Sequence, residues 1–159
     1  MKWKITTNQL SKEVICSYLL RNDNIFTPPF STRLDIKEYS DKLAKYSTHF
    51  AVYADNELIG FAACYFNHPD KEVVYISTIS VIREFQRKGI GNELLRTVII
   101  YGTMQGFEEL RLKVNISNSW AIKMYEGAGF KEKGRILGVS EMALSLKNCI
   151  ITTGESFSS

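Results

Sequence analysis

Histidine and cysteine are scarce in this chain of 159 residues, which has two histidines and three cysteines. The cysteines, Cys16, Cys64 and Cys149, are odd in number and lie far apart. Their spacing fits neither a disulfide framework nor a zinc site, so we interpret them as reduced thiols. His49 and His68 are too few for a histidine-rich metal centre, and we expect no bound metal.

A long apolar run and a strong net charge are also missing. No segment approaches the roughly 18 consecutive apolar residues that a membrane-spanning helix needs. Residues 1–5 lack the apolar stretch of a signal peptide. We therefore expect a cytoplasmic protein with no membrane partner. The formal charge of +3 is slight, which argues against a nucleic-acid partner.

The chain does have an ordinary globular composition, 45% hydrophobic and 23% charged, and a clear change of period along its length. Three central segments have strand character and follow one another through short turns, which predicts an antiparallel meander. Its first turn, Asp55-Asn56, is a tight hairpin signal. The expected strands cover residues 3–6, 49–54, 57–66, 73–81, 109–114, 130–135 and 139–146, and the expected helices cover 8–21, 33–46, 89–101 and 117–126.

The domain organisation follows from the absence of repeats and linkers. We expect one mixed α/β (α+β) domain over residues 1–146, which is large enough to bury its own core. Residues 147–159 show no periodicity, and we expect a loose tail there. Ser31 or Thr32 is the expected N-cap of the second helix.

The strongest local signal is the loop over residues 86–91, Gln-Arg-Lys-Gly-Ile-Gly, which joins a strand to a helix. Free backbone N–H groups and the helix dipole make a helix start a site for anions. Gly89 and Gly91 have no Cβ to keep a phosphate from that backbone, and Arg87 and Lys88 add positive charge. The alternative is a tight turn with solvated basic side chains. Neither the P-loop pattern nor the dinucleotide fingerprint matches, because the lysine precedes the glycine and the loop follows a meander.

The loop contains the motif Gln86-x-x-Gly89-x-Gly91, and a second motif downstream is Asn118-x-x-Ala121-x-x-x-Tyr125-Glu126-x-x-Gly129-Phe130. Both motifs resemble those of the GCN5-related N-acetyltransferase (GNAT) family, and the expected order of elements matches that fold as far as about residue 146. The resemblance implies a central, mostly antiparallel, twisted sheet, splayed between the strands before and after the cofactor-binding helix, with helices on both faces. It also implies an acyltransferase that uses acetyl-CoA as its acyl donor.

The resemblance further implies where the cofactor binds. Backbone groups at the end of the strand before the loop pair with the pantetheine arm as an added strand would. The loop holds the pyrophosphate, and Asn118 contacts the pantetheine, caps its own helix, or does both. The implied cofactor-binding residues are Ile79, Ser80, Val81, Gln86, Arg87, Lys88, Gly89, Ile90, Gly91, Asn118 and Tyr125.

Tyr125 is the predicted catalytic residue, because it matches the family tyrosine that protonates the departing thiolate. A phenol with a pKa near 10 remains protonated at pH 7 and can serve as this acid. The alternative is a core residue, since Tyr125 shares a helix face with Ala121 and Ile122.

The general base stays open, because Ser77 and Thr78 stand where many relatives have a carboxylate. Neither hydroxyl is a base unaided, so a relayed water or an amine that arrives neutral would be needed. Glu72, Tyr75 and His68 are remoter candidates.

The loop over residues 26–33 is expected to form a wall of the acceptor site, because it contains two prolines, two aromatics and Arg33. The alternative is that Phe26 and Phe30 pack into the core. Such a wall suits a polar, anionic small molecule. The expected substrate-binding residues are Phe30, Arg33, Tyr75 and Ser77.

The expected reaction moves an acetyl group from acetyl-CoA to a primary amine of a small molecule, by direct attack in a ternary complex. The run over residues 28–33, followed by the helix around residues 39–43, is similar to family members that acetylate amino sugars. The alternatives are an acetyltransferase of protein N-termini or lysines, and a non-catalytic domain that binds acyl-CoA as a regulator. The sequence leaves a homodimer open.

Overall fold

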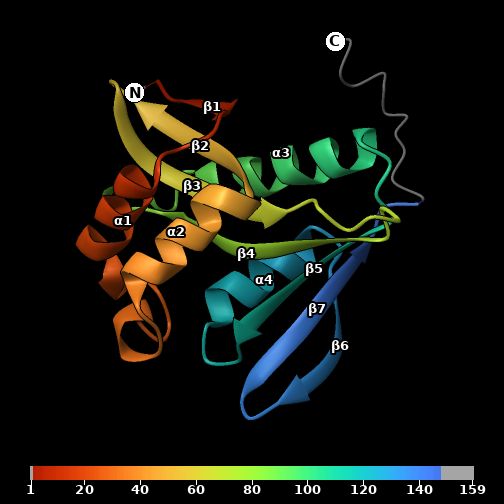
Figure 1. The fold of residues 1–159 in the computed structure, drawn as a ribbon. Coiled ribbons are helices and arrows are strands. Elements are labelled where there is room, and N and C mark those ends of the chain that lie inside the picture. Colours follow the sequence, from red (N-terminus) through yellow and green to blue (C-terminus); the bar gives the residue numbers. More distant parts are fainter. Residues whose placement is uncertain (1, 148–159) are drawn as a thin grey trace.

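A computed structural model describes residues 2–147, so nearly all of the predicted tail lies outside the described residues (Figure 1). The type and order of every predicted helix and strand are confirmed. The strands are β1 Lys4–Thr7, β2 Thr48–Ala54, β3 Glu57–Tyr65, β4 Val73–Val81, β5 Glu109–Asn115, β6 Lys131–Ile136 and β7 Val139–Ser145. The helices are α1 Lys12–Arg21, α2 Ile36–Tyr46, α3 Ile90–Met104 and α4 Ser119–Gly127, with the short 3-10 turns η1 Asp23–Ile25, η2 Phe30–Thr32 and η3 Arg83–Phe85.

The helices α1 and α2 begin three or more residues later than predicted, because the capping side chains lie further along the chain. The Ser11 hydroxyl caps α1 and accepts from the Val14 N–H. The Asp35 carboxylate caps α2 by accepting from two first-turn N–H groups. The prediction of Ser31 or Thr32 as the cap of α2 was therefore wrong, and both residues belong to the separate turn η2.

The seven strands form one sheet in the order β1-β2-β3-β4-β5-β7-β6, which is antiparallel except between β4 and β5. The β4–β5 pairing covers only Val73–Tyr75 against Glu109–Arg111. Between β3 and β4 the register shifts so that Ser77 is an extra residue in β4, a β-bulge. From Ile76 onward β4 has no partner on its β5 side, which confirms the splayed sheet.

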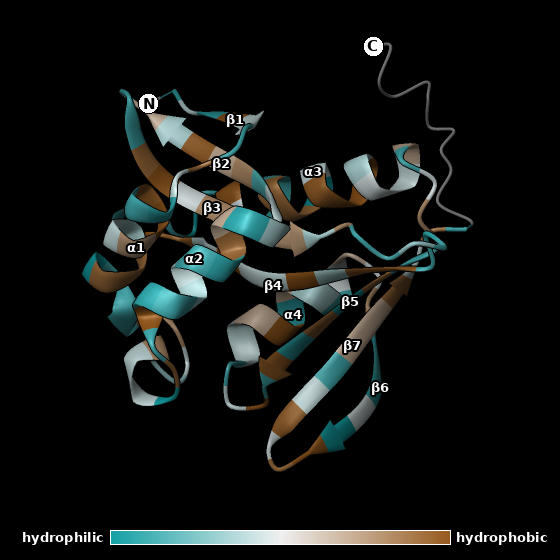
Figure 2. Ribbon diagram, viewed as in Figure 1, coloured by the Kyte–Doolittle hydropathy of each residue, from teal (hydrophilic) through white to brown (hydrophobic). Residues whose placement is uncertain are grey.

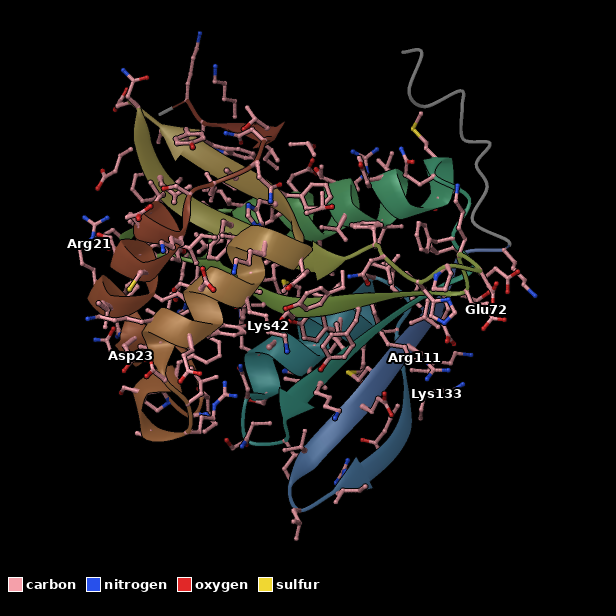
Figure 3. All side chains as sticks on the ribbon, in the orientation of Figure 1. Arg21, Asp23, Lys42, Glu72, Arg111 and Lys133 are labelled. Carbon is pink, nitrogen blue, oxygen red and sulfur yellow. The ribbon has the colours of Figure 1, made fainter. Side chains whose placement is uncertain are left out.

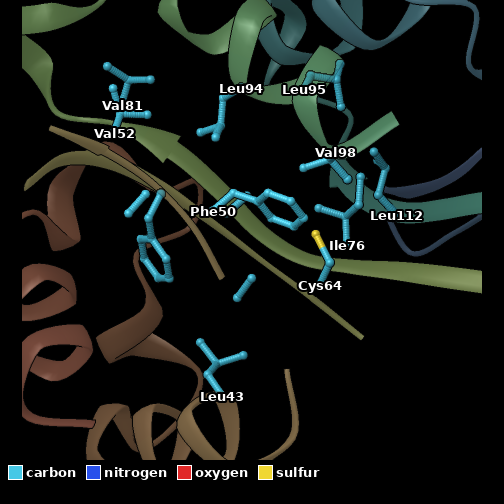
Figure 4. Close-up of a cluster of buried hydrophobic side chains, with 14 of the residues drawn as sticks. Leu43, Phe50, Val52, Cys64, Ile76, Val81, Leu94, Leu95, Val98 and Leu112 are labelled. Carbon is cyan, nitrogen blue, oxygen red and sulfur yellow. The ribbon is translucent and has the colours of Figure 1, made fainter. Parts of the chain in front are cut away.

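Helices cover both faces of the sheet, as predicted (Figure 1). Phe50 and Val52 of β2 point toward α3, where Leu94, Leu95 and Val98 complete an apolar layer (Figure 4). The opposite face packs on α1 and α2. Apolar residues concentrate on the central strands and on α3, so the core lies within this layered centre (Figure 2). None of the helices in residues 2–147 is long and apolar enough to cross a membrane.

His49 lies in the core between β2, α1 and α2, and its tautomer is fixed by its partners. Nδ1 accepts a hydrogen bond from the Leu10 N–H at 2.8 Å, so Nε2 carries the hydrogen and donates to the Leu43 carbonyl at 2.9 Å. Burial lowers the pKa of His49, and the hydrogen bond to Leu43 opposes this decrease less strongly. The imidazole is therefore neutral in the folded protein at pH 7.

We expect His49 to make folding stability sensitive to acid. Its folded pKa lies below the unfolded value of about 6.5, so the unfolded chain binds the extra proton. The contribution of His49 to the free energy of unfolding is complete above about pH 6.5. It is lost as the pH falls from there through the pKa of the folded state. Urea unfolding between about pH 8 and about pH 5 should show this loss, and His49→Gln should flatten it while costing about 1–3 kcal/mol at high pH. His68→Gln is the control, because the His68 side chain is partly exposed in the turn before β4. If the free energy of unfolding of His49→Gln depends on pH as steeply as that of the wild type, the prediction is wrong.

Candidate active site

A cleft of about 1010 Å³ opens where β4 and β5 separate. Its lining comes from the η1–η2 segment, α2, β4, the loop before α3, β5 and α4. Segments that are far apart in the sequence thus meet at the place in the sheet where β4 and β5 stop pairing. An extended ligand can lie in this cleft along the edge of β4 that has no partner on its β5 side.

The loop over residues 86–91 closes one end of the cleft. Arg87 and Gly89 have positive φ angles of 64° and 82°, and Gly89 is the N-cap of α3. The Gln86 side-chain amide donates to the Val81 carbonyl at 2.9 Å and ties the loop to β4. The first helical hydrogen bond runs from Glu93 to Gly89, so the N–H groups of residues 90–92 have no helical partner. A Cβ on Gly89 would meet no protein atom within 4 Å, so the space before this helix start is free for an anion.

Gly91 has a second role that the sequence did not predict. A Cβ on Gly91 would lie 3.3 Å from the Met124 sulfur and 3.8 Å from the Trp120 ring. The small residue therefore lets α4 pack closely against the start of α3. Trp120 lines the cleft beside it, with 53% of its surface exposed.

The structure brings most of the predicted cofactor residues to the cleft. Ile79, Ser80, Val81, Gln86, Arg87, Gly89, Gly91, Asn118 and Tyr125 all line it. Two do not: the Lys88 side chain is exposed outside the lining, and the Ile90 side chain is buried in the core. Only the backbone N–H of Ile90 can serve a ligand. The Asn118 side chain accepts from the Ala121 N–H at 3.3 Å, so it caps α4 and lines the cleft at once.

Tyr125 is both core residue and cleft residue. It is 7% exposed and packs against Phe130, with ring centroids 5.7 Å apart. Burial raises the pKa of Tyr125, and the neighbouring Cys64 adds a smaller increase. The phenol is therefore protonated at neutral pH, which is the form that a general acid requires.

Two serine hydroxyls in the part of β4 that β5 leaves unpaired contact tyrosine hydroxyls from α1 and α2. The Tyr39 Oη lies 2.7 Å from the Ser77 Oγ, and the Tyr18 Oη lies 3.0 Å from the Ser80 Oγ. Burial raises the pKa of Tyr39 to about 12, and its hydrogen bond to Ser77 opposes the increase. Tyr39 was not among the predicted site residues, because nothing in the sequence pairs it with Ser77.

The described lining residues include neither Asp nor Glu, so a carboxylate base is missing from this part of the cleft. His68 and Glu72, named as remoter candidates, lie 4.0 Å apart in the turn before β4 and are not among the lining residues. Tyr75, Ser77 and Thr78 do line the cleft. The hydroxyl groups of β4 can therefore order a water molecule but cannot act as a base themselves.

Aromatic rings build the opposite end of the cleft. Phe26 and Phe30 are 4.5 Å apart between centroids, and Phe30 and Tyr39 are 5.1 Å apart. Phe30 is buried and also lines the cleft. The two alternatives for this loop, packing into the core and forming a wall of the cleft, therefore both apply to Phe30. The Arg33 guanidinium lies over the Phe30 ring at 4.5 Å. The predicted substrate residues Phe30, Arg33, Tyr75 and Ser77 thus all reach the cleft.

Known proteins resemble this chain in sequence and in fold. An uncharacterized N-acetyltransferase from Methanocaldococcus jannaschii is 32% identical over 93 residues, 56% of this chain and 41% of that protein, so the match spans less than half of that relative. N-alpha-acetyltransferase 50 from Danio rerio is 26% identical over 133 residues, 82% of this chain and 77% of that protein. The PaiA N-acetyltransferase from Thermoplasma acidophilum, solved in complex with coenzyme A, has a TM-score of 0.73 at 20% identity and covers 91% of this chain and 99% of its own.

The family assignment rests on a longer match. Residues 17–130, which include both motifs and most of the cleft, match the acetyltransferase (GNAT) family. The predicted fold is confirmed by the sheet order, the splay after Tyr75 and the structural similarity. The chain therefore belongs to the GNAT family of acetyltransferases.

Proposed function

We propose that the protein is an acetyl-CoA-dependent N-acetyltransferase that acts on a primary amine of a small molecule by direct attack in a ternary complex. The observation that carries this proposal is the continuity of the cleft. The anion-binding start of α3 lies at one end, the buried phenol of Tyr125 lies along it, and aromatic and hydroxyl side chains form the other end. Family membership supports the same reaction.

Each part of the cleft has a task in this reaction. Acetyl-CoA supplies the thioester whose acetyl group is transferred. The N–H groups at the start of α3 and the Arg87 side chain would hold its pyrophosphate, and the backbone of residues 79–81, which has no partner on its β5 side, would align its pantetheine arm. Tyr125 donates a proton to the sulfur as the carbon–sulfur bond breaks and the new carbon–nitrogen bond forms. Tyr39 holds the Ser77 hydroxyl where it can order a water that receives the proton of the amine.

A protein N-terminus is the second candidate acceptor, favoured by the alignment with N-alpha-acetyltransferase 50 over 82% of this chain. The aromatic cluster of Phe26, Phe30 and Tyr39 favours a small molecule instead, because small-molecule pockets are typically lined by aromatic side chains with a few polar groups. Release of free CoA thiol, measured with small amines and with short peptides, separates the two. If acetyl-CoA binds but no amine or peptide releases thiol, the chain is a binding domain and the catalytic proposal fails.

Trp120 should report cofactor binding by its fluorescence. Its half-exposed indole lines the cleft beside the start of α3, whereas Trp3, the second tryptophan of the chain, precedes β1 at the far edge of the sheet. A CoA molecule bound at this helix start would change the solvation of Trp120. We expect CoA titration to change the emission of the wild type and of Trp3→Phe but not that of Trp120→Phe. If Trp120→Phe shows the same emission change on CoA titration as the wild type, the cofactor binds away from Trp120.

A further inference from the structure

The charged side chains that line the cleft are all positive among the described residues. They are Arg33, Arg87 and Lys113, with no carboxylate in the lining. Arg87 belongs to the loop that is proposed to hold the pyrophosphate. Arg33 and Lys113 come from other segments, the η2–α2 connection and β5, so the cofactor phosphates do not account for them. A cleft with surplus positive charge beyond its cofactor loop favours a ligand that brings negative charge of its own.

Arg33 is positioned for such a ligand. Its guanidinium lies over the Phe30 ring at 4.5 Å, and its Nε lies 3.5 Å from the Pro28 carbonyl. Within residues 2–147 it forms no ion pair with a carboxylate. A guanidinium has five N–H donors in a planar fork that matches a carboxylate or phosphate. The stacked ring orients this fork and leaves its outer donors free.

Two tyrosines line the cleft together with Arg33. Tyr39 packs on the same Phe30 ring as the Arg33 guanidinium, with ring centroids 5.1 Å apart, and Tyr75 is a second lining residue. Burial raises the pKa of both Tyr39 and Tyr75, and the positive charge of Arg33 opposes the increase for each. Tyr39 in turn contacts Ser77 at the bulge of β4, where the cleft continues toward Tyr125. An anion bound at Arg33 would therefore sit beside hydroxyl donors, on the path to the reacting atoms.

The basic side chains of β5 have carboxylates beside them, as an ion pair for Arg111 and as a register partner for Lys113. Arg111, the register partner of Tyr75, lies 2.7 Å from Glu109, which is also 3.7 Å from Lys133 (Figure 3). Lys113 lies two residues further along β5, on the same face as Arg111. Its register partner on β7 is Glu141, whose charge adds to the burial effect that raises the pKa of Tyr75. Arg33, by contrast, has no carboxylate within ion-pair distance in the described part of the chain.

We propose that the acceptor is a primary amine that also carries a carboxylate or a phosphate, and that Arg33 binds this anion. The inference rests on the proposed N-acetyltransferase function and narrows its substrate class. Binding the anion over Phe30 would orient the amine toward Ser77 and Tyr125. A polycationic amine would meet Arg33, which forms no ion pair with a carboxylate within residues 2–147, and would bind poorly.

The test compares amines that differ only in the anion. L-leucine is paired with L-leucinamide, phosphoethanolamine with ethanolamine, and glucosamine 6-phosphate with glucosamine, with kanamycin as a polycation and a short peptide as a macromolecular acceptor. CoA thiol release should give at least about tenfold higher kcat/KM for the anionic member of one pair. The carboxylate and phosphate pairs distinguish the two sources of charge.

Variants connect that preference to Arg33. Arg33→Gln should lower kcat/KM for the anionic amine at least about tenfold, change that for its neutral twin less than about twofold, and leave the Kd of acetyl-CoA unchanged. Arg96→Gln is the matched control, since Arg96 pairs with Glu93 on α3 and does not line the cleft.

Several outcomes would overturn the inference while leaving the N-acetyltransferase function intact. These are equal turnover of both twins, preference for kanamycin or for the peptide, and a fall in Arg33→Gln that is the same for charged and neutral amines. Absence of thiol release with every acceptor, although acetyl-CoA binds, is a different result. It would refute the proposed function and the acceptor class together.

Discussion

Replacing Tyr125 with phenylalanine is expected to lower kcat by about 10²- to 10⁴-fold, the range associated with loss of a general acid. The substitution removes one oxygen from a ring that packs against Phe130, so the core should keep its shape. The Kd of acetyl-CoA should change by less than about twofold, because the lost proton donation matters only as the carbon–sulfur bond breaks. Burial raises the pKa of Tyr125, so the wild type should not lose this proton near pH 10, where a free phenol would ionise.

Tyr101→Phe provides the matched control for Tyr125→Phe. Tyr101 also packs on aromatic rings, with its centroid 5.2 Å from that of Phe50, but it lies on α3 and does not line the cleft. Its variant should keep wild-type kcat. Steady-state thiol release and isothermal titration with acetyl-CoA measure the two quantities. Wild-type kcat in Tyr125→Phe would remove Tyr125 from the role of acid.

Local patterns in the sequence predicted those parts of the fold that neighbouring residues determine. The bounds of β4 agree with the predicted strand over residues 73–81. The Asp55-Asn56 hairpin signal was also correct, since both residues have positive φ, 52° and 67°. The two glycines at the start of α3 indicated an anion site for the same reason: a helix start with free N–H groups is a local property. The conclusion that the anion is a pyrophosphate needed the second motif.

Contacts between distant segments were beyond the reach of the sequence. The Tyr39–Ser77 hydrogen bond joins residues 38 positions apart, and the position of Ser77 depends on a bulge that is visible only in the β3–β4 register. The position of Arg33 over Phe30 required the turn η2, whose residues were predicted as part of the loop over residues 26–33. The sequence could not identify Trp120 as a cleft residue rather than a core residue, because it does not show which face of α4 meets the cleft.

Gly89→Val should raise the Kd of acetyl-CoA at least about tenfold, which is the effect of losing one charge-assisted hydrogen bond worth about 1.5–3 kcal/mol. A Cβ at this position would meet no protein atom within 4 Å, so the valine would occupy the space that a phosphate needs. The residue also has a φ of 82°, which a β-branched side chain adopts only under strain, at a cost of about 1–3 kcal/mol in stability.

Gly138→Val separates the two effects of the Gly89 substitution. Gly138 has a φ of 79° and equally open surroundings, but it lies in the β6–β7 turn and does not line the cleft. It should lose a similar amount of stability in urea unfolding and keep the wild-type Kd for acetyl-CoA. If both variants bind acetyl-CoA with the same Kd, backbone strain alone accounts for the effect of Gly89→Val. The start of α3 is then not the pyrophosphate site. If only Gly89→Val binds weakly while both remain folded, the loss lies in the contact between the cofactor and the helix start, because strain is common to the two.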